Sequence, residues 1–206
     1  MAPRHAAALR HLRNADPKLG AWIDHVGACG WRRSTEGKHF DHIARAIVYQ
    51  QLSGAAAGTI HGRMLALYGG RNPTPAELMR TPDPKLRAVG LSGRKSEYLK
   101  DLARRAHDGS LPVETLHELD DASVIETLTA VRGIGEWTAQ MFLMFRLARP
   151  DVLPVLDLGV QKAVQLIYGT RSLPSPKRVA KIGAKWAPYR TVAAWYLWRR
   201  VDDPPQ

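Results

Sequence analysis

Apolar residues recur at intervals of three and four along most of this chain, whereas the alternation typical of a half-buried β-strand is scarce. This pattern predicts an all-α fold. Four prolines between 73 and 84 divide one stretch into short helices and turns, because proline fixes φ and lacks an amide donor. The expected helices cover roughly 5–13, 17–28, 39–51, 54–68, 75–80, 84–88, 94–107, 114–118, 122–131, 136–147, 158–168, 175–186 and 189–201.

One turn between two expected helices is unusually tight. Gly133 and Gly135 stand on either side of a single apolar residue, and only glycine allows such a turn with its amides exposed. Exposed amides beside a helix start bind phosphate. The pattern is that of a helix-hairpin-helix, which holds one DNA strand without reading its base sequence. An ordinary structural turn is the alternative for this short match alone. The expected DNA backbone contacts come from Arg132, Gly133, Ile134, Gly135 and Thr138.

Composition narrows the class of partner. The chain has 206 residues, 45% of them hydrophobic, which suffices for one ordinary domain or for two small lobes around one cleft. Its net charge of +11 indicates a polyanionic partner. Nucleic acid is the leading candidate, and a merely solvated basic surface is the alternative.

Cysteine content and hydropathy point to a compartment. Cys29 is the only cysteine, which excludes an internal disulfide, a cysteine-ligated zinc site and an iron–sulfur cluster. The most apolar run, 139–145, ends at Arg146 and is too short for a bilayer. The N-terminus lacks the apolar core of a secretory signal. From these three observations together we expect a soluble cytoplasmic protein, nucleoid-associated if bacterial, with no membrane partner.

Three stretches together resemble one protein family. They are Ile-Val-Tyr-Gln-Gln-Leu-Ser at 47–53, Gly-Leu-Ser-Gly-Arg-Lys at 90–95, and the block 131–160. The chain resembles the helix-hairpin-helix DNA glycosylase superfamily and, within it, the alkylation-repair branch, 3-methyladenine DNA glycosylase II. This resemblance implies base excision repair by hydrolysis, a monomer without a cofactor, and double-stranded DNA containing alkylated bases as the partner.

The resemblance also implies a domain organisation. Residues 1–206 would form a single glycosylase domain of the compact form, with two helical lobes and the DNA in the cleft between them. One lobe, 40–149, is six-helix-barrel-like and contains the hairpin 131–138. The other lobe joins 1–39 to 150–206.

Asp157 is the expected catalytic residue. It precedes the helix 158–168, where an aspartate is an ideal N-cap, so capping alone is the alternative. The family's catalytic aspartate matches Asp157 in spacing and in the Leu-Gly-Val that follows. The two roles are compatible, because a helix N-terminus favours an anion. Cleavage of a base–sugar bond builds positive oxocarbenium character, which a carboxylate stabilises while water attacks.

Three tryptophans bear on the expected reaction type and on the base that is recognised. Superfamily members that also cut the DNA strand carry a Schiff-base lysine where this chain has Trp137, which implies no lyase activity. Trp137 is expected to line the base pocket, with a core anchor as the alternative. Trp198 matches a pocket tryptophan, but Trp195 lies on much the same helical face. Aromatic faces suit cationic alkylated purines. Met141 replaces a family tyrosine, so the pocket is expected to be less aromatic.

Other residues are expected to contact DNA. Leu52 matches the family's wedge, an apolar side chain that fills the gap left by a flipped base, whereas a core leucine is the alternative. Gln51 and Ser53 flank it and are expected at the backbone. The segment 90–95 echoes the hairpin, which would bring Arg94 and Lys95 near phosphates, unless it is an ordinary helix start.

Two histidines are candidates for a metal site. His39 and His42 could share one helix face toward a metal, but no third ligand recurs nearby, so solvated or phosphate-contacting histidines are favoured. The family resemblance allows a monovalent cation at the hairpin carbonyls 132–135. The alternative functions are a non-catalytic DNA-binding hairpin module, or a glycosylase for uracil, hypoxanthine or a mismatched base.

Overall fold

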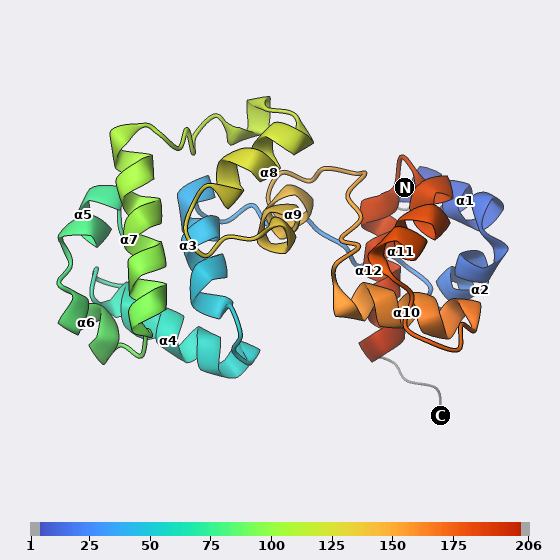
Figure 1. Ribbon diagram of the computed structural model, residues 1–206, viewed down its shortest axis with the longest axis horizontal. Helices are drawn as coiled ribbons and strands as arrows, with labels where there is room; N and C mark the ends of the chain where they lie inside the picture. The colour runs from blue at the N-terminus through green and yellow to red at the C-terminus, as the bar shows by residue number, and fades with distance from the viewer. Residues whose placement is uncertain (1–4, 203–206) are drawn as a thin grey trace. The chain divides into compact units, whose positions relative to one another are not determined.

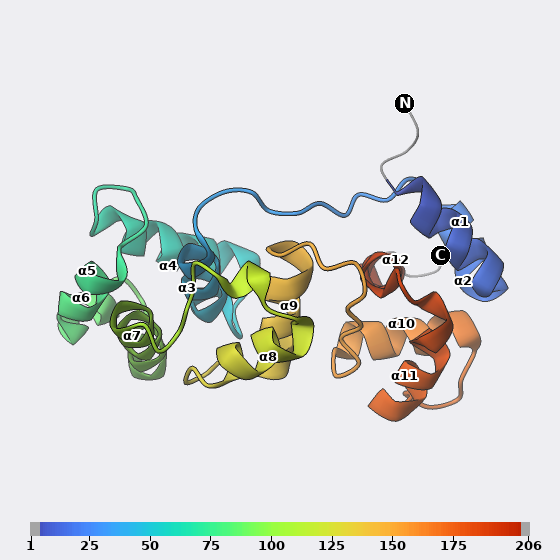
Figure 2. The same cartoon turned by 90° about the horizontal axis from the view of Figure 1, so that it is seen from above.

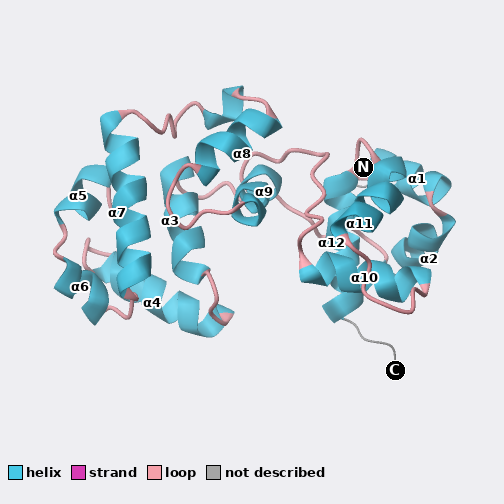
Figure 3. Cartoon of the chain, viewed as in Figure 1, coloured by secondary structure: helices cyan, strands magenta, loops and turns pink. Residues whose placement is uncertain are grey.

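The computed structural model describes residues 5–202, and within that range it contains helices and turns but no strand, which confirms the predicted all-α fold (Figure 3). Among residues 5–202, none of the helices has the length and hydrophobicity that a membrane-spanning segment needs. Residues 1–4, part of the N-terminal stretch predicted to lack a secretory signal, lie outside the described range. The helices are α1 (Ala6–Ala15), α2 (Pro17–Val26), α3 (His39–Tyr49), α4 (Gly54–Ala66), α5 (Pro75–Arg80), α6 (Asp83–Ala88), α7 (Gly93–Asp108), α8 (Asp121–Thr129), α9 (Glu136–Phe145), α10 (Leu158–Tyr168), α11 (Pro176–Gly183) and α12 (Arg190–Asp202).

Side-chain caps mark where many of these helices begin. At such an N-cap, a side-chain oxygen accepts the amide of the third helical residue, which otherwise has no partner in the helix. These N-caps are Asp16, Ser53, Thr74, Ser92, Asp120, Asp157 and Ser175. The one expected helix that does not form is 114–118, where only a 3₁₀ turn, Leu116–Glu118, is present. The segment forms this short 3₁₀ turn before the Asp120 cap starts α8.

The chain divides into two compact units. Unit 2 spans 34–142. In it α3 packs against α4 and α7, while α5 and α6 cover another side of α7 (Figure 1). The buried residues of α3, among them Phe40, Ile43 and Ile47, recur at helical spacing and form its core-facing stripe.

Unit 1 joins residues up to 33 to the segment from 143 onward. In it α2 packs against α10 and α12, and α1 packs against α2 (Figures 1 and 2). Its core is built around the fully buried Trp186 and Tyr196, with Leu12, Leu19 and Ile23 from the N-terminal helices. The unit boundaries fall at 33/34 and 142/143, within α9 in the second case. The lobe boundaries 39/40 and 149/150 stay a prediction.

Candidate functional site

The turn between α8 and α9 requires glycine at only one of its two glycine positions. Gly133 has φ +78°, a backbone conformation that other residues rarely adopt, and a Cβ on it would lie 2.1 Å from Cδ2 of Tyr98. Any other residue would therefore be strained and would clash with Tyr98. Ile134 is buried, and its amide donates to the Val131 carbonyl at 3.1 Å inside the turn. Gly135 has no positive φ, and no protein atom lies within 4 Å of a Cβ placed there. The expectation that the turn needs both glycines is therefore wrong for Gly135, which instead leaves open space beside the start of α9.

Two polar contacts hold this turn in place. Asp101 of α7 accepts the Arg132 amide at 3.0 Å, and it also accepts hydrogen bonds from Arg104 and Arg105. Burial alone would raise the pKa of Asp101, but these hydrogen bonds lower it below its ordinary value. The side chain of Gln50, the C-cap of α3, donates to the Gly133 carbonyl at 2.8 Å. One of the carbonyls expected to hold a monovalent cation thus already accepts a hydrogen bond.

The turn between α3 and α4 presents Leu52. Gln51 adopts φ +56°, a left-handed conformation that a residue other than glycine rarely takes, at a cost of about 1–2 kcal/mol. Leu52 is 39% exposed, so the core alternative does not hold. Ser53 caps α4 by accepting the Ala56 amide at 3.3 Å.

Lys95 supports this turn from α7. Its ammonium donates to the carbonyls of Val48 and Gln50, each at 2.7 Å, and so satisfies the C-terminal end of α3. The expected phosphate contact of Lys95 stays a prediction, but two of the three ammonium donors are already bound within the protein. Arg94, by contrast, is exposed.

The segment before α7 repeats the local geometry of the hairpin. Gly90 has φ +105°, Leu91 after it is buried, and Ser92 caps α7. Gly133 and Ile134 follow the same order before α9. The echo seen in the sequence is thus a similar backbone turn, since each has a left-handed glycine followed by a buried apolar anchor.

Three segments of unit 2 meet around one cavity of about 410 Å³. Trp137 lines it and is 45% exposed, which overturns the core-anchor alternative. Six of the predicted site residues line this cavity. The predicted residues of unit 2 that do not line it are Leu52, Ser53, Arg132, Ile134, Gly135 and Met141. The lining residues are Gln50, Gln51, Ser92, Arg94, Lys95, Tyr98, Gly133, Trp137 and Thr138.

Asp157 belongs to unit 1, where it is the N-cap of α10. Its Oδ1 accepts the Val160 amide at 2.8 Å and the indole N–H of Trp198 at 3.1 Å. The first bond confirms the predicted cap. The second comes from α12, so two helices fix the orientation of this carboxylate.

The structure separates the two tryptophans of α12. Trp198 donates to Asp157 and stacks on Phe145, with ring centroids 5.9 Å apart and planes inclined by 25°. Trp195 lies over Gly30, where a Cβ would come within 2.9 Å of its ring. Trp198 is therefore the tryptophan next to the carboxylate.

Sequence reasoning missed two residues here, Phe145 and Gly159. A Cβ on Gly159 would lie 3.0 Å from Asp157 Oδ1 and 3.3 Å from Trp198 Cδ1, so glycine makes room for their contact. Glycine is a poor helix former, and its presence in the first turn of α10 was the available signal. Phe145 carried no signal beyond an apolar helix.

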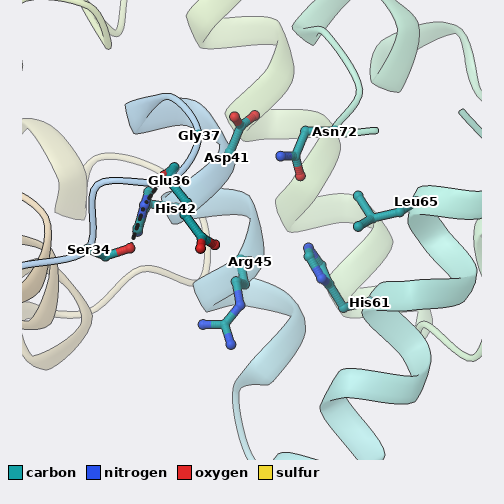
Figure 4. A pocket seen from close by; sticks show the side chains of 9 residues that line it. All are labelled: Ser34, Glu36, Gly37, Asp41, His42, Arg45, His61, Leu65 and Asn72. Atoms are coloured by element: carbon teal, nitrogen blue, oxygen red, sulfur yellow. Dashed lines mark hydrogen bonds between the residues drawn. The ribbon is translucent and has the colours of Figure 1, made fainter. Parts of the chain in front are cut away.

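The paired histidines of α3 face different partners. The His42 Nε2 lies 2.8 Å from the Glu36 carbonyl oxygen and 3.4 Å from the Ser34 hydroxyl, at the edge of a second cavity of about 480 Å³ (Figure 4). The His39 ring instead contacts the rings of His117 and Phe142. Among residues 5–202, no three side chains of His, Cys, Asp or Glu gather closely enough to hold a metal ion.

Known proteins resemble this chain over nearly its whole length. The model of the HhH-GPD superfamily of base excision DNA repair proteins matches residues 44–189. DNA-3-methyladenine glycosylase 1 of Schizosaccharomyces pombe is 35% identical, covering 92% of this chain and 84% of the relative. DNA-3-methyladenine glycosylase of Saccharomyces cerevisiae is 32% identical, covering 93% of this chain and 78% of the relative.

Solved structures of DNA glycosylases are also similar to this chain. The Schizosaccharomyces pombe enzyme Mag1 in complex with abasic DNA has a TM-score of 0.87 at 34% identity, covering 96% of this chain and 97% of its own. DNA-3-methyladenine glycosidase from Bacillus halodurans has a TM-score of 0.83 at 38% identity, covering 93% and 88%. Together with the family match, these likenesses confirm the family predicted from the three sequence stretches.

Proposed function

Because the chain belongs to the HhH-GPD superfamily of base excision DNA repair proteins, we propose that it is a DNA glycosylase that hydrolyses the N-glycosidic bond of alkylated bases of the 3-methyladenine class. The observation that carries this proposal is the Asp157 carboxylate, held by Val160 and Trp198 at the start of α10. Relatives that cover most of the chain bear the corresponding enzyme name.

The chemistry requires a fixed anion. As the base leaves with the bonding electron pair, positive charge develops on the sugar, and the Asp157 carboxylate stabilises that charge. A water molecule then adds to the anomeric carbon, and its proton is lost to solvent or to the carboxylate. Two N–H donors and the helix N-terminus stabilise the carboxylate as an anion, so little reorganisation accompanies the reaction.

Unit 2 supplies the DNA contacts in this proposal. The amides beside Gly133 and Gly135 hold one strand, Arg94, Arg132 and the nearby polar side chains contact phosphates, and Leu52 fills the space of the flipped base. The left-handed Gln51 and the Lys95 hydrogen bonds support this function, because they hold the Leu52 turn at a fixed place.

In this proposal, Trp137 and Met141 of unit 2 and Trp198 of unit 1 are the residues that recognise the base. An alkylated purine carries positive charge, and a cation over a tryptophan face gains about 0.5–2 kcal/mol. A damaged base therefore binds better than a neutral one. Because tryptophan stands where lyases have a lysine, the reaction stops at an intact abasic strand.

A base-release assay tests the proposal. Purified protein is incubated with duplexes that contain 3-methyladenine, 7-methylguanine, ethenoadenine, hypoxanthine or uracil, and the strands are separated with and without alkali. We expect release of methylated purines, strand breakage only after alkali, and no adduct trapped by borohydride. Binding without any base release would support a non-catalytic module. Nicking without alkali or a trapped adduct would contradict the monofunctional assignment.

A further inference from the structure

A basic pocket of about 490 Å³ lies in unit 1, between the start of α2, the end of α10 and α11. Four cationic residues line it, Lys18, Arg178, Lys181 and Lys185, and no carboxylate residue lines it. The pocket is at the far end of α10 from Asp157, about 16 Å away at 1.5 Å per residue. It therefore lies outside the carboxylate site described above.

The positive charge in this pocket is only partly compensated. Lys185 forms an ion pair with the buried Asp16 at 3.1 Å, which offsets one of the four charges. Lys18 donates to the Tyr168 carbonyl at 3.4 Å, a contact that leaves its charge in place. Within the described part of the chain, the side chains of Arg178 and Lys181 form no ion pair and are exposed. A bound anion would face all of these groups.

The pocket also has an apolar component. Tyr168 and Ile182 line it beside the lysine stems. The ammonium groups of Lys18 and Lys185 lie 5.7 Å and 6.0 Å from the centre of the Tyr168 ring, within reach of a cation–π interaction. The pocket therefore offers both positive charge and apolar surface to a ligand.

We propose that this pocket binds an acidic peptide segment of a partner protein, with carboxylates at the cationic rim and an apolar side chain against Tyr168 and Ile182. DNA fits less well, because phosphates on a duplex stand on a convex backbone that has no apolar group to enter the recess. Carboxylates pair with arginine in bidentate geometry, which suits the exposed Arg178.

Fluorescence anisotropy with defined peptides tests this proposal. The probe is fluorescein-labelled Ser-Gly-Asp-Glu-Asp-Asp-Leu-Phe. In one comparison peptide Asn and Gln replace the acidic residues, and in the other Ser-Gly replaces the terminal Leu-Phe. The test variant combines Arg178→Glu and Lys181→Glu. The control combines Arg10→Glu and Lys177→Glu, which changes the net charge equally at exposed positions that do not line the pocket.

We expect the test variant to weaken binding of the acidic peptide by about tenfold or more, and the control by less than about threefold. Both altered peptides should bind more weakly than the parent probe. Circular dichroism and base release should be unchanged in both variants. Equal loss in the two variants would show diffuse charge attraction and overturn the proposal. Absence of peptide binding to the parent protein would also overturn it. If the test variant alone lost affinity for a twelve-nucleotide single strand or an undamaged duplex, the pocket would be a nucleic-acid contact, and the proposal would again be wrong.

Discussion

At the scale of single residues, Asp157 combines a structural and a chemical role in one carboxylate. Its Oδ1 receives both the Val160 amide and the Trp198 indole, so helix capping and orientation toward α12 use the same atom. Asparagine is also a good N-cap and keeps the shape of the side chain, but it lacks the negative charge. This substitution therefore separates the two roles.

We expect Asp157→Asn to lower the single-turnover rate of base release by at least about a hundredfold, because charge stabilisation in the transition state is lost. Binding to an abasic-site analogue duplex and the melting temperature should change little. Near-parental excision with unchanged melting temperature would mean that Asp157 is only a cap, and the proposed mechanism would then be wrong.

Gly159 offers a test of how closely Trp198 must approach this carboxylate. A Cβ at 3.0 Å from Asp157 Oδ1 requires a shift of a few tenths of an ångström in Asp157 or Trp198. Gly159→Ala should slow base release by about tenfold, since small misplacements of catalytic groups are costly. Thermal stability should change little, because the better helix propensity of alanine offsets the crowding.

Gly62→Ala is the matched control for Gly159→Ala. Gly62 also lies inside a helix, α4, but no atom lies within 4 Å of a Cβ placed there. It should raise the melting temperature slightly and leave excision unchanged. Equal rates for Gly159→Ala and the parent would show that the carboxylate tolerates the shift.

At the scale of elements, the turn that carries Leu52 is positioned by contacts from α7 and the hairpin. Leu52→Ala should slow excision by about tenfold while binding to lesion-free duplex stays nearly constant, because a wedge acts only when the base is flipped. Leu67→Ala is the control, since Leu67 is 40% exposed against 39% for Leu52 and lies in the same unit. Similar excision rates for the two variants would reject the wedge.

The same elements show what sequence alone could predict. Helix starts were predictable to within a residue or two where local caps such as Ser53 and Asp157 mark them. The bonds from Lys95 to the end of α3 join residues 45 and 47 positions apart, and the Trp198 bond to Asp157 spans 41. No local pattern encodes such partners, because they depend on how helices pack. For that reason the sequence predicts only a phosphate contact for Lys95.

At the scale of the whole molecule, the net charge of +11 should appear in the salt dependence of DNA binding. Each neutralised phosphate contributes about −0.9 to the slope of log affinity against log salt, so contacts from Arg94 and Arg132 alone predict a slope of about −2 or steeper. Replacing both with alanine should flatten it by about two units, whereas Arg10→Ala should not. A flat salt dependence of the parent would contradict binding through phosphates.

Asp16 joins three elements of unit 1 at one buried carboxylate. It caps α2 and accepts hydrogen bonds from Tyr168 at the end of α10 and from the Trp186 indole at 2.8 Å, while Lys185 lies 3.1 Å away. Burial by itself would raise the pKa of Asp16, but these partners lower it below its ordinary value. A lowered pKa in the folded state adds stability above the ordinary carboxyl pKa, and that stability is lost as pH falls through the folded-state value.

Asp16→Asn should therefore lower the free energy of unfolding by about 2–4 kcal/mol at pH 7. The deficit relative to the parent should begin to shrink below about pH 4, where Asp16 of the unfolded parent binds a proton, and it should keep shrinking until the pH falls through the lowered pKa of the folded state. Urea titrations followed by tryptophan fluorescence suit this test, because five of the six tryptophans lie in unit 1. Asp24→Asn removes only an exposed ion pair with Arg13 and should cost less than about 1 kcal/mol. A deficit for Asp16→Asn that stays constant from pH 7 to pH 3 would mean that shape, and not charge, makes this carboxylate stabilising.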